Sequence, residues 1–149
     1  MPKVLVLYHS QEFGNTAAMA EAIAEGVRSS GAEVELFNTN DGRASMEQYR
    51  TASAVAFGSP DYYSYIAGGL KVFLDDWHIA KQSNPGGLTG KPYALFYSHG
   101  GGGKVRGPLE KLFAGAGTQV GQTVESKGAP DAAVLAACRQ LGADLANAV

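Results

Sequence analysis

Short apolar runs alternate along the whole chain with stretches in which apolar residues recur every three or four positions. The runs are rich in β-branched and aromatic residues and predict strands over residues 4–8, 33–37, 52–57, 92–97 and 118–124. The periodic stretches predict helices over residues 16–27, from Ser45 onward, and over 70–77, 109–113 and 135–145. Five strands alternating with five helices indicate an α/β fold, a doubly wound parallel sheet with helices on both faces.

The length and composition favour one self-sufficient domain. Its 149 residues, taken as the single domain 1–149, can bury enough surface to fold without disulfides or metals. Cys138 is the single cysteine, which excludes a disulfide framework, and the chain starts with a strand rather than a signal peptide, so we expect a cytoplasmic protein. No apolar run approaches the length of a membrane span, and a net charge of −2 gives no reason to expect nucleic acid as a partner.

Doubly wound sheets bind ligands beyond the carboxyl ends of their strands, so the loops after the first, third and fourth strands form the candidate site. The first of these loops, residues 10–16, leads straight into a helix. The hydroxyls of Ser10 and Thr16, the Asn15 amide and the free N–H groups of a helix start form a cradle for an anion, without lysine or arginine. A polar turn with an ordinary N-cap would have the same sequence.

The second loop, residues 58–69, carries Tyr62, Tyr63 and Tyr65 at the ligand end of the sheet. Tyrosines in this place suit stacking against a planar heteroaromatic ligand, although a contact between subunits would use them as well. The loop has no glycine between Asp61 and Ala67, so a left-handed backbone conformation there would be costly.

The third loop, residues 98–107, begins with Ser98 and His99 and continues with four consecutive glycines. Backbone without side chains can approach the edge of a bound ring closely, and a flexible connection is the alternative. His99 either touches such a ligand or is structural. The chain's histidines show no metal-ligand spacing, so we expect no metal site.

Taken together and in this order, the three loops resemble the flavodoxin-like family, which includes flavodoxins and flavodoxin-like NAD(P)H:quinone oxidoreductases. Residues 8–23 resemble the family's FMN phosphate loop and first helix, residues 58–75 resemble its second flavin loop, and Ser98 with the glycines resembles its third. The resemblance implies the strand order 2-1-3-4-5 and one FMN bound non-covalently. It implies a cofactor site formed by Ser10, Gly14, Asn15, Thr16, Ser59, Pro60, Asp61, Tyr62, Tyr63, Ser98, His99, Gly100, Gly101, Gly102 and Gly103.

Two features depart from the family pattern. The first loop holds one residue more than usual between Ser10 and Gly14, and it carries Glu12. Because a carboxylate would repel a phosphate, we expect Glu12 to face water. The long insertions that support the tetramers of the quinone oxidoreductases are absent.

The resemblance implies a redox protein that transfers electrons to and from redox partner proteins. The alternative is an FMN-dependent enzyme that takes hydride from NAD(P)H and reduces quinone-like acceptors; in a third reading the flavin only stabilises the fold. Chain length favours the electron carrier. No side chain is assigned a catalytic role because the flavin carries the chemistry. We expect a monomer or a small homo-oligomer.

Overall fold

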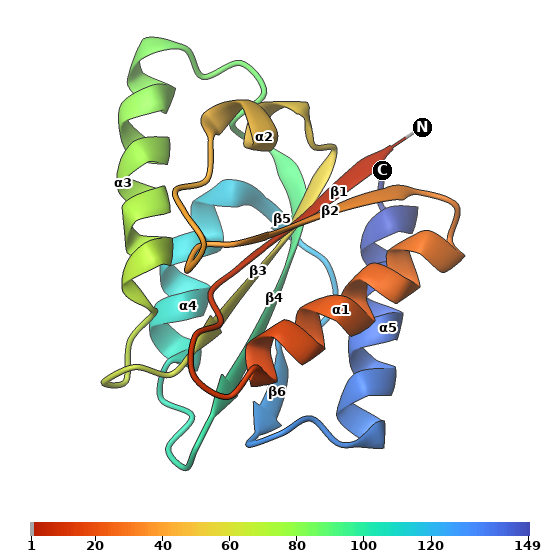
Figure 1. The fold of residues 1–149 in the computed structure, drawn as a ribbon. Helices are drawn as coiled ribbons and strands as arrows, with labels where there is room; N and C mark the ends of the chain where they lie inside the picture. Colours follow the sequence, from red (N-terminus) through yellow and green to blue (C-terminus); the bar gives the residue numbers. More distant parts are fainter. Residues whose placement is uncertain (1) are drawn as a thin grey trace.

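A parallel β-sheet forms the middle layer of the computed structural model, which describes residues 2–149 (Figure 1). Its strands are β1 (Lys3–Tyr8), β2 (Glu33–Asn38), β3 (Ala54–Pro60), β4 (Lys91–His99), β5 (Gly117–Gln119) and β6 (Val124–Lys127). They lie in the order β2-β1-β3-β4-β5, and β6 also pairs with β4. The predicted order 2-1-3-4-5 is therefore confirmed.

The fifth strand differs from its prediction as one unbroken run over residues 118–124. β5 pairs with the beginning of β4, at Lys91 to Tyr93, and β6 pairs with the end of β4, from Phe96 to His99. Gly121 interrupts the run with a φ of 69°, a left-handed conformation that a strand does not contain. Gly117 pairs with Lys91 but Val124 pairs with Phe96, so the interruption sets β6 back along β4 by two residues relative to a continuous strand.

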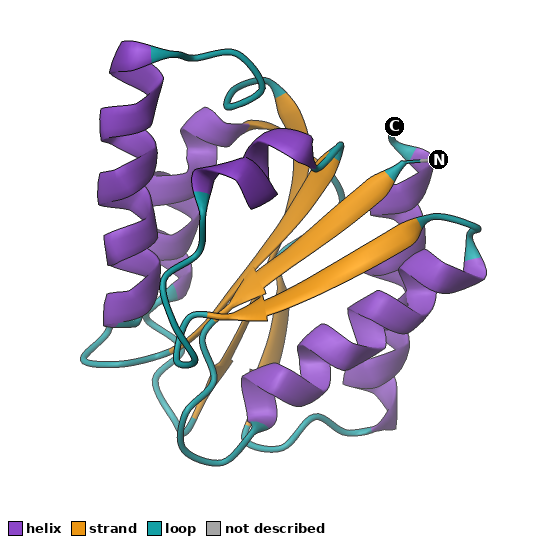
Figure 2. Cartoon of the chain, turned by 45° about the horizontal axis from the view of Figure 1, so that its top comes forward, coloured by secondary structure: helices purple, strands orange, loops and turns teal. Residues whose placement is uncertain are grey.

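Helices cover both faces of this sheet (Figure 2). They are α1 (Asn15–Ser29), α2 (Met46–Thr51), α3 (Gly68–Ser83), α4 (Arg106–Phe113) and α5 (Ala132–Asn147), with a short 3₁₀ turn, η1 (Ala114–Ala116). Helices α1 and α5 pack on one face, and α2, α3 and α4 pack on the other. Ser45 caps α2 as expected: its hydroxyl accepts the Gln48 N–H at 3.1 Å, and the Gln48 side chain accepts the Ser45 N–H at 2.9 Å.

The central strands are apolar through most of their length because both of their faces are buried. In β1, Leu5 and Leu7 point into the core beneath α3, whereas Val4 and Val6 point into the core beneath α1. These two cores fix the sheet between its helices and leave the loops at its carboxyl end free to form a site. Within residues 2–149, no helix is both long enough and apolar enough to cross a membrane.

The unpaired hydroxyl of Tyr49 allows a stability test of the core beneath α3. Its side chain is fully buried against Phe57 and Phe73, with ring centroids 6.2 and 5.5 Å away, and its hydroxyl has no hydrogen-bond partner among residues 2–149. Burial raises the pKa of this phenol far above its usual range. An unpaired buried hydroxyl costs roughly 1–3 kcal/mol, so Tyr49→Phe is expected to raise the free energy of unfolding by about 1 kcal/mol. Urea unfolding measures this change, and a loss of stability would mean that the hydroxyl has a partner.

Candidate functional site

The loops that follow β1, β3 and β4 meet at one end of the sheet, opposite the two chain termini (Figure 1). They enclose an open cavity of about 300 Å³, at the lower limit of the volumes found for small-molecule sites. Its lining contains the expected residues Ser10, Gly14, Asn15, Thr16, Pro60, Asp61, Tyr62, Ser98, His99 and Gly100. The predicted residues Ser59, Tyr63, Gly101, Gly102 and Gly103 lie outside the lining.

The first loop presents the start of α1 to this cavity. Gly14, with a φ of 75°, occupies the N-cap position and supplies no side-chain hydrogen bond to the helix. The Ser10 hydroxyl accepts the N–H of Ala17 at 3.2 Å, and the Thr16 hydroxyl, which is buried, hydrogen-bonds with that of Ser98 at 2.8 Å. The first N–H groups of α1 therefore remain available, beside hydroxyl groups that can turn toward a ligand.

Residues outside the predicted set hold the first loop in place. Asn38, at the end of β2, accepts the Ser10 N–H at 3.0 Å and donates to the Ser10 carbonyl at 2.9 Å. The buried ring of His9 hydrogen-bonds with Thr39 at 2.8 Å and with Gln11 at 2.9 Å. The contacts of Asn38 and Thr39 join the end of β2 to the loop, and a single sequence gives little sign of them because these partners lie 28 and 30 positions away.

Four residues line the cavity although the predicted set of site residues does not contain them: Gln11, Glu12, Phe13 and Gly128. Glu12 is exposed to water, as expected, but it also lines the cavity, and Phe13 is 80% exposed. Gly128 reaches the cavity because its N–H donates to the carbonyl of His99 at 2.7 Å. It directly follows β6, whose last residue, Lys127, pairs with His99.

In the second loop, Asp61 connects two parts of the site. Its N–H donates to the Ser98 carbonyl at 2.9 Å, and its carboxylate accepts the N–H groups of Ser64 at 2.8 Å and Val105 at 3.2 Å. One side chain thus ties the second loop to the third. The Ser59 hydroxyl is buried, donates to the Pro60 carbonyl at 2.7 Å and accepts the Ala67 N–H at 3.1 Å.

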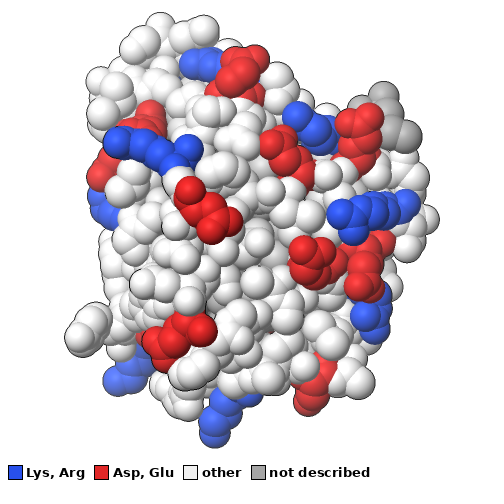
Figure 3. Space-filling view, in the orientation of Figure 1, with Lys and Arg blue, Asp and Glu red and all other residues white. Residues whose placement is uncertain are grey.

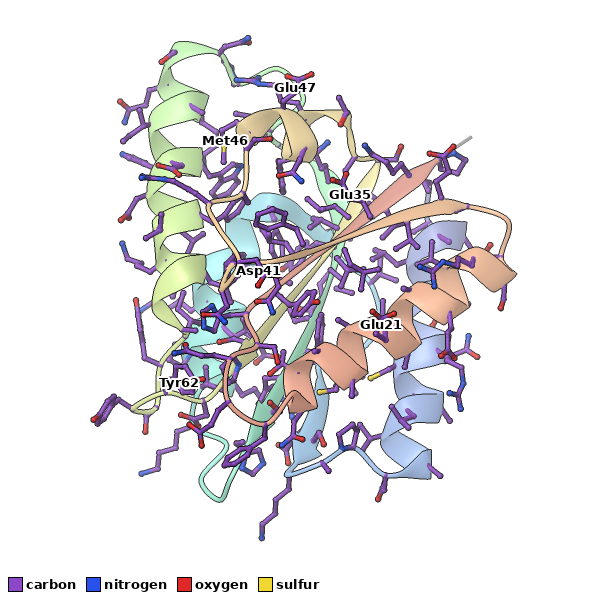
Figure 4. The ribbon with its side chains drawn as sticks, viewed as in Figure 1. Glu21, Glu35, Asp41, Met46, Glu47 and Tyr62 are labelled. Carbon is purple, nitrogen blue, oxygen red and sulfur yellow. The ribbon has the colours of Figure 1, made fainter. Side chains whose placement is uncertain are left out.

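The tyrosines of the second loop form a tight turn. Tyr62 and Tyr65 exchange two backbone hydrogen bonds of 3.1 Å, and between them Tyr63 and Ser64 have φ values of 56° and 63°. This pair of positive φ values is the pattern of a type I′ turn. Tyr62 lies at the loop end of the sheet (Figure 4) and lines the cavity, whereas Tyr63 is fully exposed. The costly left-handed conformation therefore occurs despite the absence of glycine.

The backbone strain of this turn can be removed by a glycine substitution. Because a left-handed residue with a Cβ costs roughly 1–2 kcal/mol, Ser64→Gly is expected to raise the free energy of unfolding by about 1 kcal/mol. Thermal or urea unfolding gives the value. Ser64→Ala is the matched control, since it removes the same hydroxyl but keeps the Cβ, and it should bring no gain. Equal effects of the two substitutions would contradict this account of the turn.

The third loop covers a cluster of ionisable side chains at the end of β4. The His99 side chain is 5% exposed, and its Nε2 lies 3.3 Å from Oε1 of Glu125, close enough for an ion pair but outside hydrogen-bond geometry. The Tyr97 hydroxyl donates to the same carboxylate. Burial, followed by this hydrogen bond, raises the pKa of Tyr97 to about 12, whereas Tyr97 and His99 lower the pKa of Glu125. Gly103, at a φ of 65°, lies directly against His99.

This arrangement fits the FMN that the sequence resemblance implies. A phosphate monoester can be held by neutral hydroxyl and N–H donors at a helix start, and Ser10, Thr16 and the first N–H groups of α1 supply these donors. Tyr62 offers an aromatic surface, and the side-chain-free Gly100 lets a ring approach the backbone. A cluster of three or more metal-ligating side chains is not found in the described part of the chain.

Comparison with known proteins agrees with this geometry. The sequence model of the flavodoxin family matches residues 6–142. An oxidase of the reduced coenzyme F420 from Methanothermobacter thermautotrophicus is 33% identical over 97% of this chain, and a flavodoxin from Aquifex aeolicus is 38% identical over 69% of it. The chain spans only 35% and 53% of the lengths of these two relatives.

One solved structure matches over nearly its full length. It is a flavodoxin from the domain Archaea, 28% identical, and the alignment covers 98% of this chain and 97% of that one with a TM-score of 0.83. A flavodiiron protein from Giardia intestinalis has the same fold in 35% of its chain, with 24% identity and a TM-score of 0.81.

Proposed function

This chain belongs to the flavodoxin family, and from that premise we propose that it carries electrons between redox partner proteins with one FMN bound in the cavity. FMN supplies chemistry that no side chain has, because it accepts and donates electrons singly or in pairs. The protein contributes binding, orientation and the electrostatic surroundings of the cofactor.

The start of α1 is the observation that carries this proposal. Gly14, the N-cap residue, supplies no side-chain hydrogen bond to the helix, and the Ser10 and Thr16 hydroxyls lie at this point. We assign these groups and the Asn15 backbone to the FMN phosphate. Tyr62, Asp61 and the backbone of Gly100 are assigned to the isoalloxazine ring.

The surface around the cavity suits transient contact with another protein. Phe13 and Tyr63 expose aromatic rings, and aromatic side chains are enriched where proteins bind one another. Charged groups of both signs are interspersed over the face shown in Figure 3, in keeping with a net charge of −2. Strong charge steering toward one kind of partner is therefore not expected.

We further propose that the protein works in the cytoplasm as a monomer or small homo-oligomer. Cys138, its single cysteine, is a free thiol, and burial raises the pKa of this thiol to about 12. Such a thiol is inert toward disulfide exchange. This agrees with a reducing compartment and with a structural role for Cys138.

Anaerobic mixing with NADH and NADPH tests the proposal. The purified protein should hold one FMN per chain, and its flavin absorbance should stay unchanged with either nucleotide until an NADPH-dependent flavoprotein reductase is added. Rapid bleaching by a nucleotide alone, followed by turnover on a quinone, would replace the carrier with the oxidoreductase. A protein that binds no FMN would refute both.

A further inference from the structure

Gln11 lines the cavity with one end of its side-chain amide unpaired. The amide oxygen accepts the Nε2–H of His9 at 2.9 Å, because an amide oxygen can only accept a hydrogen bond. The NH₂ group at the other end of the same amide has no hydrogen-bond partner within residues 2–149. Gln11 therefore brings free donors to a cavity whose lining, over the described part of the chain, contains no lysine or arginine.

His9 fixes the orientation of this amide. The His9 ring is buried, and its Nδ1 lies 2.8 Å from the hydroxyl oxygen of Thr39, directly after β2. The ring also meets Tyr62 edge to face, with centroids 6.1 Å apart and planes at 77°. A ring held by these neighbours restrains the long side chain of Gln11 before any ligand arrives, so less rotamer freedom is lost on binding.

The position of His9 shows which part of a flavin Gln11 serves. His9 lies on the α3 side of the sheet, since a Cβ added at Gly69, at the start of α3, would lie 3.1 Å from its Nδ1. The start of α1, to which the phosphate is assigned, belongs to the helix layer on the opposite face (Figure 1). Tyr62, which is assigned to the isoalloxazine ring, contacts His9 directly. The Gln11 amide is therefore placed toward the ring and away from the phosphate.

A second pair of the same residue types provides a comparison. In α3 the side-chain nitrogen of Gln82 lies 3.0 Å from Nε2 of His78. Both residues of this pair are exposed, and neither lines the cavity. The pair at the cavity differs in having a buried histidine and a glutamine that reaches a ligand site.

We propose that Gln11, held by His9, is a flavin-binding residue, and that its NH₂ group donates a hydrogen bond to an oxygen atom of the uncharged part of the flavin, which FMN shares with riboflavin. The inference rests on the proposed function, because a flavin is the ligand considered. His9 does not line the cavity and is a positioning residue that acts through Gln11.

Titration of the apoprotein with FMN and with riboflavin, followed by quenching of flavin fluorescence, tests the donor. Gln11→Leu has a similar size without hydrogen-bonding groups, and it should weaken both flavins by the same factor, roughly two- to tenfold, as expected for one neutral hydrogen bond. Gln11→Glu keeps an oxygen for His9 but removes the NH₂ group, so its riboflavin affinity should fall as in Gln11→Leu. Gln82→Leu is the matched control and should bind both flavins as wild type does.

A double-mutant cycle tests the role of His9. His9→Phe keeps an aromatic ring beside Tyr62 and removes the hydrogen bond to Gln11. Each single substitution should weaken FMN binding, and the double variant of His9→Phe and Gln11→Leu should bind no more weakly than the weaker single variant. Losses that add would mean that the two residues act separately, which would overturn the positioning role. The cycle uses FMN alone and does not depend on riboflavin affinity.

The Gln11 variants decide the proposal even if His9→Phe folds poorly, because Gln11 is exposed and its replacement leaves the core intact. Unchanged FMN binding in Gln11→Leu, or wild-type riboflavin binding in Gln11→Glu, would overturn the inference and leave the proposed function intact. A loss confined to FMN would also overturn it, because it would place the amide at the phosphate. Wild-type protein that binds no FMN would instead refute the proposed function.

Discussion

Replacing Gly142 with alanine is expected to lower the free energy of unfolding by about 3 kcal/mol, because helices α1 and α5 touch through their backbones. A Cβ at Gly142 would lie 2.0 Å from the carbonyl oxygen of Ile23. The contact is reciprocal, since a Cβ at Gly26 would lie 1.9 Å from the carbonyl oxygen of Arg139. Backbone atoms cannot rotate away as the end of a side chain can, so the two helices would have to separate and lose packing along their shared face.

Thermal unfolding measures the effect, and for a domain of this size a loss of about 3 kcal/mol lowers Tm by roughly 6–12 °C. Gly68→Ala is the matched control, because Gly68 also lies in a helix, α3, but has open space where a Cβ would be. Alanine there should be neutral or should stabilise by up to about 1 kcal/mol through its higher helix propensity. Similar Tm values for the two variants would show that α1 and α5 are not in close contact.

The arrangement of the fold follows from the sequence because its strands are buried on both faces and its helices on one. The apolar run 4–8 fits only a strand, and the periodic spacing of 16–27 fits only a helix. Because strands and helices alternate along the chain, the sheet must be mostly parallel. The division of the fifth strand into β5 and β6 was not predicted, for a local reason. Residues 118–124 have strand composition around Gly121, and only the pairing with the long β4 shows that the glycine divides them.

The site was harder to predict because its residues are positioned by partners far away in the sequence. Composition identified the loops, but the direction of each side chain depends on contacts such as Asp61 with Val105 or Asn38 with Ser10. Tyr62 and Tyr63 are neighbours of the same type, yet the left-handed turn sends one into the cavity lining and the other into solvent. Nothing in the local sequence distinguishes them, because the turn is stabilised by the Asp61 carboxylate rather than by a glycine.

Thr16→Val is expected to weaken FMN binding by roughly tenfold to a hundredfold, since a hydrogen bond to a charged group contributes roughly 1.5–3 kcal/mol. Thr16 is 2% exposed and lies in the first turn of α1, where the dipole of the helix favours an anion. Within residues 2–149, no lysine or arginine lines the cavity, so each neutral donor carries a larger share of the phosphate affinity than it would beside a cation. Valine keeps the shape of threonine and removes only the hydroxyl, which avoids a cavity in the core.

Titration of the apoprotein with FMN and with riboflavin distinguishes a lost phosphate contact from general damage. The Thr16 hydroxyl also bonds with Ser98, so its removal leaves that hydroxyl without its partner and costs some stability in the free protein. This cost is common to both ligands, whereas a contact with the phosphate affects FMN alone. Riboflavin affinity should therefore stay nearly constant in Thr16→Val, and Thr16→Ser, which retains the hydroxyl, should bind FMN almost as wild type does. An equal loss for riboflavin and FMN would mean that Thr16 shapes the site through Ser98 and that the phosphate lies elsewhere.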